Sequence, residues 1–379
     1  AIDNILVRAN KILLNGKIVA LTEEMKKKIL KVATEMSDDA LRVLGVAFKD
    51  VDAVIVPEEI EKNLVVVGIV GMIDPPRTEV KDSITEAKNA GITPIMITGD
   101  HKNTAVAIAK ELGIATDISQ SLTGAEIDEL SDKEFSENIG KYRVFARVSP
   151  EHKVKIVRAF KEKGNIVSMT GDGVNDAPSL KFADIGVAMG ITGTDVSKGA
   201  SDMILTDDNF TTIVHAIEEG RNIYNNIKKT IIFLLSCNLG EIICIFLSTL
   251  LNWDLPLVAT QLLWVNLVTD TLPALALGID PGDKDVMKRS PRNPKESFFS
   301  EGAGMRAVIG GGLIGLLTLA AFYIGISETG MIGNLGQLEA MAKNGNEAAK
   351  HALTQGRTMA FIVLTVSQLF YSLTMRNSQ

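Results

Sequence analysis

Cysteine is scarce in this chain of 379 residues, which has only Cys237 and Cys244, both in one apolar run. If that run is a helix, the two residues are about 10 Å apart along its axis, at a rise of about 1.5 Å per residue. That separation excludes a disulfide between them. We expect two plain core or lipid-facing side chains, which say little about the redox compartment.

An excess of positive charge is also lacking. The formal net charge is −7, which argues against nucleic acid as a partner. No secretory signal peptide opens the chain, because residues 1–6 are neither basic nor sufficiently apolar. An initiator methionine is missing as well, and we expect the chain to be an excerpt of a longer gene product.

Charged and apolar residues are unevenly distributed. The mean hydropathy is +0.19 although 22% of the residues are charged, a combination that is rare in a soluble domain. Residues 1–229 have the composition of an ordinary soluble protein, whereas long apolar runs dominate from residue 230 onward. The length is sufficient for two or three domains.

Residues 64–230 alternate between strand-like apolar runs and helical patterns, which indicates a parallel α/β sheet. In such sheets the chemistry lies at the carboxyl ends of the strands. We expect strands at 41–48, 64–72, 92–97, 144–148, 166–169, 185–188 and 203–205, and helices at 21–35, 79–90, 103–112 and 150–163.

Four apolar segments follow, and each is near the roughly 20 residues that span a bilayer, although the last is short. We expect helices at about 228–251, 255–277, 305–326 and 357–375. The loop after the second segment is basic, which places it and the soluble part in the cytoplasm. The loop at 327–357 is then external or lumenal, but it also carries basic residues, so the charge rule is only a bias here.

Residue types that phosphoryl transfer uses follow two predicted strands. Thr98 and Asp100 come just past one strand, Asp172 and Asp176 come just past another, and Lys153 lies in the first turn of a helix between them. A transferring phosphoryl group carries spread negative charge and usually a Mg²⁺ ion, for which carboxylate oxygen is a suitable ligand. A lysine adds compact positive charge. Neighbouring glycines let backbone N–H groups approach an anion.

Ordinary turn chemistry is the competing interpretation of these residues, because Gly-Asp pairs are common in turns. For Thr98 to Asp100 taken alone the two interpretations are evenly matched. For residues 168–176 the turn interpretation is weak. Two carboxylates four residues apart, with Asn175 between them, concentrate charge unless a cation is bound there.

Polar residues also interrupt the first two apolar segments. Asn238 and Glu241 share one helix face, and Asn266, Thr269 and Asp270 share another. Ionisable groups at membrane depth cost about 3 kcal/mol or more and usually mark an ion pathway. All five side chains offer oxygen, which favours a hard cation over copper or zinc. Asn and Thr can instead bridge helices, but that explanation does not suit paired acids.

Several ordered motifs resemble the phosphorylation domain of P-type ATPases, which belongs to the haloacid dehalogenase superfamily. They are Met72-Ile-Asp-Pro-Pro-Arg77, Met96-Ile-Thr-Gly-Asp100, Phe145-Ala-Arg-Val148 with His152-Lys153, and Met169-Thr-Gly-Asp-Gly-Val-Asn-Asp-Ala-Pro178. Cys237-Asn-Leu-Gly-Glu241 and Gln261-Leu-Leu-Trp-Val-Asn-Leu-Val-Thr-Asp270 are similar to the fifth and sixth helices of sarco/endoplasmic-reticulum-type calcium pumps.

The resemblance implies an α/β fold followed by an all-α membrane part. Residues 1–60 would be the carboxy-terminal remnant of a nucleotide-binding domain. Residues 61–225 would form a haloacid-dehalogenase-like (Rossmann-like) phosphorylation domain, and residues 226–379 a transmembrane helix bundle.

The resemblance also assigns residues to phosphate chemistry. Asp172 would bind catalytic Mg²⁺, and Asn175 and Asp176 would hold the phosphorylation site and its nucleotide. Thr98, Gly99 and Asp100 would contact the phosphate and position water, whereas Lys153 would neutralise the phosphate. For ATP itself the implied contacts come from Arg42 and Arg147, together with Thr98, Gly99, Asp100, Lys153 and Asn175.

In the membrane the resemblance implies that Ca²⁺ is bound by Asn238, Glu241, Asn266, Thr269 and Asp270. The family has a glutamate in its eighth helix. Our alignment puts Thr365 there, with Ser367 and Gln368 nearby, and residues 359–373 contain no acid. One of the two calcium sites of the family is therefore in doubt, and we hypothesise one Ca²⁺ per cycle.

The implied function is ATP-driven transport of Ca²⁺ out of the cytoplasm through an aspartyl-phosphate intermediate, across the cell membrane if the source is bacterial. The family's Asp-Lys-Thr-Gly-Thr motif does not occur in this sequence, so we expect a missing amino-terminal portion of the same pump to supply it. Two alternatives remain open: a pump for Mn²⁺, Na⁺ or H⁺, and a non-catalytic membrane regulator with the same fold. Four apolar segments exclude a soluble phosphatase.

Overall fold

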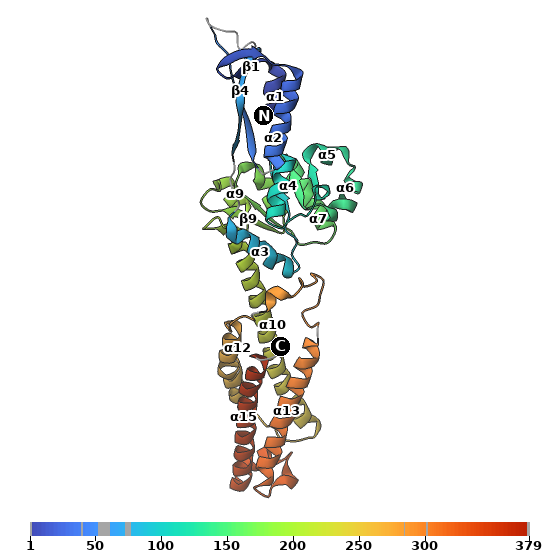
Figure 1. The fold of residues 1–379 in the computed structure, drawn as a ribbon. Coiled ribbons are helices and arrows are strands. Elements are labelled where there is room, and N and C mark those ends of the chain that lie inside the picture. The colour runs from blue at the N-terminus through green and yellow to red at the C-terminus, as the bar shows by residue number, and fades with distance from the viewer. Residues whose placement is uncertain are drawn as a thin grey trace. The chain divides into compact units, whose positions relative to one another are not determined.

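The computed structural model of this chain describes residues 2–38, 41–51, 61–72, 77–283, 285–300 and 302–376. It divides into two units, Ala1–His215 and Ala216–Gln379, and each is considered by itself (Figure 1). Within the motif at 72–77, residues 73–76 lie outside the described part of the chain.

The first unit begins with a four-stranded mixed sheet of order β2-β1-β4-β3. Its central strand β4 (Leu64–Met72) is parallel to β1 (Ala9–Leu14) and antiparallel to β3 (Arg42–Phe48). Helices α1 (Ile2–Arg8) and α2 (Glu23–Asp38) share one apolar core with this sheet.

The short hairpin between β1 and β2 (Lys17–Ala20) was missing from the sequence expectations. Asn15 and Gly16 both adopt positive φ, of 49° and 76°, as a two-residue hairpin turn of an Asn-Gly pair requires. That dipeptide was therefore the signal that would have located the hairpin.

Two three-stranded parallel sheets follow, of order β5-β7-β6 and β10-β9-β8. Their strands are β5 (Met96–Ile97), β6 (Ser121–Thr123), β7 (Val144–Ala146), β8 (Ser168–Gly171), β9 (Ile185–Met189) and β10 (Met203–Leu205). The expected parallel pairing is thus confirmed in these two sheets, whereas β4, which was expected in the same parallel sheet, belongs to the mixed sheet instead. The expected strand at 92–97 is paired only over its last two residues, and Pro94 before them has no N–H to donate.

Short helices connect these strands and cover them. They are α3 (Thr78–Asn89), α4 (Lys102–Glu111), α5 (Gly124–Glu129), α6 (Asp132–Asn138), α7 (Pro150–Glu162), α8 (Ala177–Phe182) and α9 (Asp195–Ala200). The Ser149 side chain caps α7 and Pro150 occupies its first turn. Ile97 of β5 and Met169 of β8 belong to the same apolar cluster, so the two parallel sheets share part of one core.

Three helices among the described residues are long and apolar enough to cross a membrane: α10 (Phe210–Leu250), α13 (Ala303–Ser327) and α15 (Glu347–Arg376). The span expected at 255–277 is divided instead into α11 (Ala259–Trp264), a π-helical turn at Val265–Thr269, and α12 (Thr271–Gly278). The physical reason is Pro273, which has no N–H for the carbonyl of Thr269. The N–H of Asp270 reaches back five residues to the carbonyl of Val265, at 2.9 Å.

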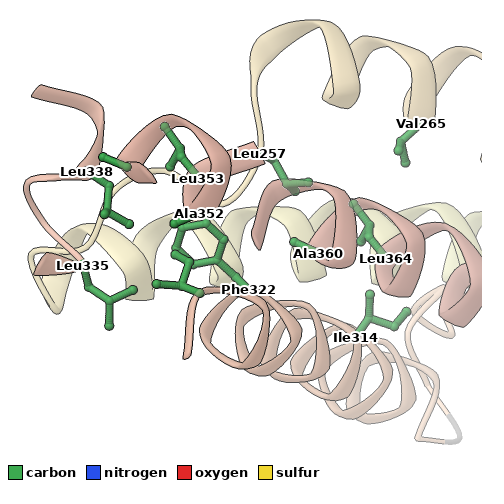
Figure 2. Close-up of a cluster of buried hydrophobic side chains, with 12 residues drawn as sticks. Leu257, Val265, Ile314, Phe322, Leu335, Leu338, Ala352, Leu353, Ala360 and Leu364 are labelled. Atoms are coloured by element: carbon green, nitrogen blue, oxygen red, sulfur yellow. The ribbon is translucent and has the colours of Figure 1, made fainter. Parts of the chain in front are cut away.

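The core of the second unit lies where α13 packs along α15. Figure 2 shows Ile314 of α13 close to Leu364 of α15 in this cluster. Helix α13 also contacts α10 through glycines. A Cβ added at Gly315 would lie 2.6 Å from the carbonyl oxygen of Gly240, so the two backbones approach closely there.

The basic loop that follows α12 contacts the polar amino-terminal part of α10 through hydrogen bonds and a cation–π contact. Arg221 donates to the carbonyls of Val286 and Arg289, at 2.8 and 2.9 Å. Arg292 lies over the ring of Tyr224, 4.1 Å from its centroid, and donates to its hydroxyl. Lys284, one of the basic residues of this loop, lies outside the described residues.

Candidate functional site

Asp176 is the centre of a compact polar cluster just past β8. Its carboxylate is 5% exposed and accepts a hydrogen bond from Lys153 Nζ at 2.5 Å. The other carboxylate oxygen accepts from the backbone N–H groups of Asp172 and Gly173, at 3.3 and 3.1 Å. A charged donor and two amides therefore compensate this buried charge.

The tight turn before Asp176 depends on Gly171. A Cβ at Gly171 would lie 2.4 Å from the Cβ of Asp176, which is closer than side chains tolerate. The cluster therefore exists only with glycine at this position. Asp172 and Asn175 lie on the same turn and are exposed, so their side chains are accessible from solvent.

Thr98 and Asp100 form a second polar group just past β5. The hydroxyl of Thr98 donates to Asp100 Oδ2 at 2.9 Å and accepts from the backbone N–H of Asp100 at 3.1 Å. Arg147, just past the neighbouring β7, has a positive φ of 50° and donates its backbone N–H to the carbonyl of Asp100 at 3.1 Å. Nothing lies within 4 Å of a Cβ built at Gly99, so this loop is open.

The structure thus brings together two sets of the predicted residues, Lys153 with Asp172 and Asp176, and Thr98 with Asp100 and Arg147. Within the described ranges, the hydrogen bonds of these residues do not join one set to the other. The backbone of Arg42 begins β3, but its side chain is outside what the structure describes.

The second unit contains a buried pair of acids. Glu241 of α10 and Asp270 at the end of the π-helical turn are 6% and 2% exposed, and Thr269 beside Asp270 is buried too. Asn266 donates to Glu241 Oε2 at 3.1 Å and to the carbonyl of Leu262 at 3.0 Å. The π-helical turn therefore directs an amide toward the acid of α10.

Asn238 behaves differently from the other predicted ion ligands. It is exposed, and its amide donates to the carbonyl of Leu234 in its own helix at 2.8 Å. The structure does not join it to Glu241 or Asp270 by a hydrogen bond in the described part of the chain.

Gln368 of α15 is a candidate site residue that the sequence indicated only as a neighbour of Thr365. Gln368 is fully buried and lies within interaction range of Glu241. Thr365 instead donates its hydroxyl to the carbonyl of Phe361 at 2.7 Å. Of the residues named for this helix, Gln368 is therefore a better candidate than Thr365 for a contact with Glu241, and the available signal was an amide in an apolar helix.

Unpaired polar atoms are concentrated around these three side chains. Within the described part of the chain, Glu241 Oε1, both oxygens of Asp270 and both polar atoms of the Gln368 amide are buried without a hydrogen-bond partner. Leaving one such group unsatisfied costs about 1–3 kcal/mol, so this concentration needs a compensating partner. The described residues contain no cluster of three or more His, Cys, Asp or Glu side chains placed for a metal, so amide and hydroxyl oxygens would have to complete an ion site.

Two family models match this chain. One is described as "P-type ATPase, cytoplasmic domain N" and matches residues 1–79. The other is described as "Cation transporting ATPase, C-terminus" and matches residues 254–379.

Curated relatives match over most or all of the chain. It is 60% identical over 378 residues to "Calcium-transporting ATPase 1" of Bacillus cereus, which covers 100% of this chain and 42% of the relative. It is 51% identical over 324 residues to "Calcium-transporting ATPase" of Bacillus subtilis, covering 85% of this chain and 36% of the relative. The match to "Calcium-transporting ATPase 2, endoplasmic reticulum-type" of Arabidopsis thaliana is 45% identical over 345 residues, covering 85% and 33%. The chain thus spans about two fifths or less of the length of these relatives.

Proposed function

Since the chain belongs to the cation-transporting P-type ATPases, we propose that it is the carboxy-terminal part of a pump that moves Ca²⁺ out of the cytoplasm using ATP. It is an integral membrane protein, and its described residues include three helices suited to crossing a bilayer. The observation that carries the proposal is the buried, unpaired set of Glu241, Asp270 and Gln368 in apolar helices.

The chemistry of the buried set suits Ca²⁺ as cargo. Two carboxylates would balance the charge of one divalent ion, and the side-chain oxygens of Asn266, Thr269 and Gln368 would add neutral ligands. Ca²⁺ takes six to eight oxygen ligands in flexible geometry, which an interrupted helix with free carbonyls can supply. The two acids favour one Ca²⁺ per cycle, and two bound Ca²⁺ per full-length pump would contradict this.

For the first unit we propose a haloacid-dehalogenase-like phosphorylation domain at about 61–225, after the end of a nucleotide-binding domain at 1–60 and before a transmembrane domain at 226–379. Parallel strands with polar groups at their carboxyl ends support the fold. Strand β4 pairs with β1 and β3 and the family's cytoplasmic domain N matches residues 1–79, and both observations favour a first boundary after β4 rather than at residue 60.

In phosphoryl transfer we propose distinct roles for the residues of the two polar groups. Lys153, held by Asp176, would neutralise phosphate charge, and Thr98 with Gly99 would bind phosphate oxygens at the open loop. Asp100 would orient water, while Asn175, Arg147 and Arg42 would contact the nucleotide. The exposed carboxylate of Asp172 is an oxygen donor that fits Mg²⁺, which when bound would offset charge on the phosphoryl group.

The acceptor of the phosphoryl group would come from the remainder of the pump. The Asp-Lys-Thr-Gly-Thr motif that carries it in the family is not found in this sequence. We therefore propose that this chain supplies residues that bind the nucleotide and phosphate and that orient the hydrolytic water. The amino-terminal portion would supply the phosphorylated aspartate.

The test uses the full-length pump in membrane vesicles. Phosphorylation by ATP should require Ca²⁺, and the Asp270→Asn variant should lose that Ca²⁺ dependence and vesicular Ca²⁺ uptake. The matched control is Asp254→Asn, an aspartate of the same unit that accepts from the N–H of Glu339 at 3.2 Å instead of belonging to the buried acid pair. Stimulation by Mn²⁺, Na⁺ or H⁺ in place of Ca²⁺ would indicate another cargo, and absence of phosphorylation would indicate a non-catalytic regulator.

A further inference from the structure

The loop at 190–194, between β9 and α9, is held by a single carboxylate. Asp208 Oδ1 accepts from the backbone N–H groups of Gly190 and Ile191, at 2.6 and 3.0 Å. Its Oδ2 accepts from the N–H and the hydroxyl of Thr192, both at 2.8 Å. Three successive amides that converge on one anion form a backbone nest, and here the anion is a side chain of the same unit.

The far end of the same loop holds the main chain of Asp172. The N–H of Thr194 donates to the carbonyl of Asp172 at 2.9 Å, and the hydroxyl of Ser197 donates to the same carbonyl at 3.0 Å. Ser197 is fully buried, whereas Asp172 is exposed. A chain of hydrogen bonds and five loop residues therefore links Asp208 to the backbone of Asp172.

The loop has little freedom to adopt another path. A Cβ at Gly193 would lie 1.9 Å from the carbonyl oxygen of Met189, so the backbone is tightly folded there. Asp208 itself has a positive φ of 50°, a conformation that aspartate tolerates better than most residues. The amide of Ile191 first, and then Thr192, lower the pKa of Asp208 to about 2. The carboxylate is thus charged at neutral pH.

We propose that Asp208 and Ser197 are positioning residues for Asp172. Asp208 holds the loop at 190–194, and this loop together with Ser197 holds the backbone of Asp172. The affinity of the Asp172 carboxylate for Mg²⁺ therefore depends on both residues. The inference rests on the proposed role of Asp172 in phosphoryl transfer. Neither Asp208 nor Ser197 touches the reacting groups. Partners that orient metal ligands typically change metal affinity by about 10- to 100-fold when removed.

The experiment measures the Mg²⁺ concentration that gives half-maximal phosphorylation of the full-length pump by ATP at saturating Ca²⁺. Asp208→Asn keeps the shape of the side chain but loses the charge and one acceptor oxygen, and it should raise this concentration about tenfold. Ser197→Ala removes one hydrogen bond and should raise it about threefold, the lesser effect of one neutral bond. Maximal phosphorylation should recover in both variants at high Mg²⁺.

Asp207→Asn is the matched control. This neighbouring carboxylate accepts from the hydroxyl of Thr212 and the N–H of Asn209 and does not bond to the loop. The Mg²⁺ dependence of phosphorylation in the Asp207→Asn pump should therefore equal that of the wild type. An unchanged half-maximal Mg²⁺ concentration in both Asp208→Asn and Ser197→Ala would overturn the inference. So would a loss of maximal phosphorylation that high Mg²⁺ does not restore, because that is the sign of a purely structural role. Failure of the wild type to phosphorylate would refute the proposed function instead.

Discussion

Single residues decide whether each polar group can form. Asp176 is buried and neutralised by Lys153, and its position depends on the missing side chain at residue 171. Glu241, Asp270 and Gln368 are buried with polar atoms left unpaired. The first group is saturated without a ligand and the second is not, which is why the second is the better candidate for binding an ion.

Gly171→Ala should disrupt the first group. The added Cβ would overlap Asp176, displace its carboxylate from Lys153 and leave a buried charge without its partner, at a cost of about 3 kcal/mol or more. We expect at least a tenfold drop in phosphorylated full-length pump and a lower Tm. Gly68→Ala, at a strand position with nothing within 4 Å, should leave both unchanged. Equal behaviour of the two variants would contradict this account of the turn.

Gln368→Leu should weaken ion binding without unfolding the unit. Leucine is similar in size and removes two buried polar atoms that have no partner, so Tm should stay level or rise. The Ca²⁺ concentration for half-maximal phosphorylation should increase about tenfold, because one oxygen ligand is lost. Thr365→Val, in the same helix, should leave that concentration unchanged, since the hydroxyl of Thr365 is bonded to Phe361. A shift in the second variant alone would indicate that Thr365, and not Gln368, contacts the ion.

Acid should loosen the loop held by Asp208. A carboxyl whose pKa is lower in the folded state stabilises the fold above its unfolded pKa, and that contribution disappears as pH falls through the folded value. The pKa of Asp208 is lowered from 3.8 to about 2, so the relevant window lies between these values. The protection of the Gly190, Ile191 and Thr192 amides, taken relative to the intrinsic exchange rate at each pH, should fall from pH 4 to pH 2 in the wild type and equally in Asp207→Asn, which keeps Asp208. In Asp208→Asn this pH dependence should vanish.

At the scale of elements, long periodic segments were predictable and short ones were not. The parallel strands β7 to β10 and the helices α4 and α7 agree with the sequence patterns within two residues, whereas β5 begins later than expected and β6 was not expected. Helices α5, α6, α8 and α9 have six or seven residues, too few for a period of 3.6 to stand out. One span was expected at 255–277, and the position of its break at 265–269 could not be predicted because a π-helical turn has no propensity signal of its own.

The interrupted segment at 259–278 should be sensitive to its proline. Pro273→Ala supplies an N–H for the carbonyl of Thr269, removes a residue that costs about 3 kcal/mol inside a helix, and favours a regular helix. We therefore expect a higher Tm together with a weaker apparent affinity for Ca²⁺, measured as the half-maximal concentration for phosphorylation. A simultaneous gain in Tm and in Ca²⁺ affinity would argue against a role for the free carbonyl of Thr269 in binding Ca²⁺.

On the scale of the whole molecule, composition predicted a chain with two different halves, and the structure has two units. The two acids of the candidate ion site could be named from sequence because charge in apolar helices is costly. The sequence could not show which polar residues face one another, because that depends on the rotation of each helix. Asn238 was expected at the site but bonds within its own helix, whereas Gln368 is the buried residue. The Asp208 loop was missed because its effect on Asp172 runs through backbone amides, which carry no sequence signature.

The π-helical turn at Val265–Thr269 contains one residue more than an α-helical path would need. Conversion to α geometry would turn everything beyond it by about 100°, the angle that one residue subtends in a helix. Asp270 would then swing out of line with Glu241 while the helix axis stayed in place. A single-residue deletion of Val268 imposes that rotation permanently. The resulting pump should be locked out of its Ca²⁺-binding form, with Ca²⁺-stimulated phosphorylation abolished although the protein still inserts and folds.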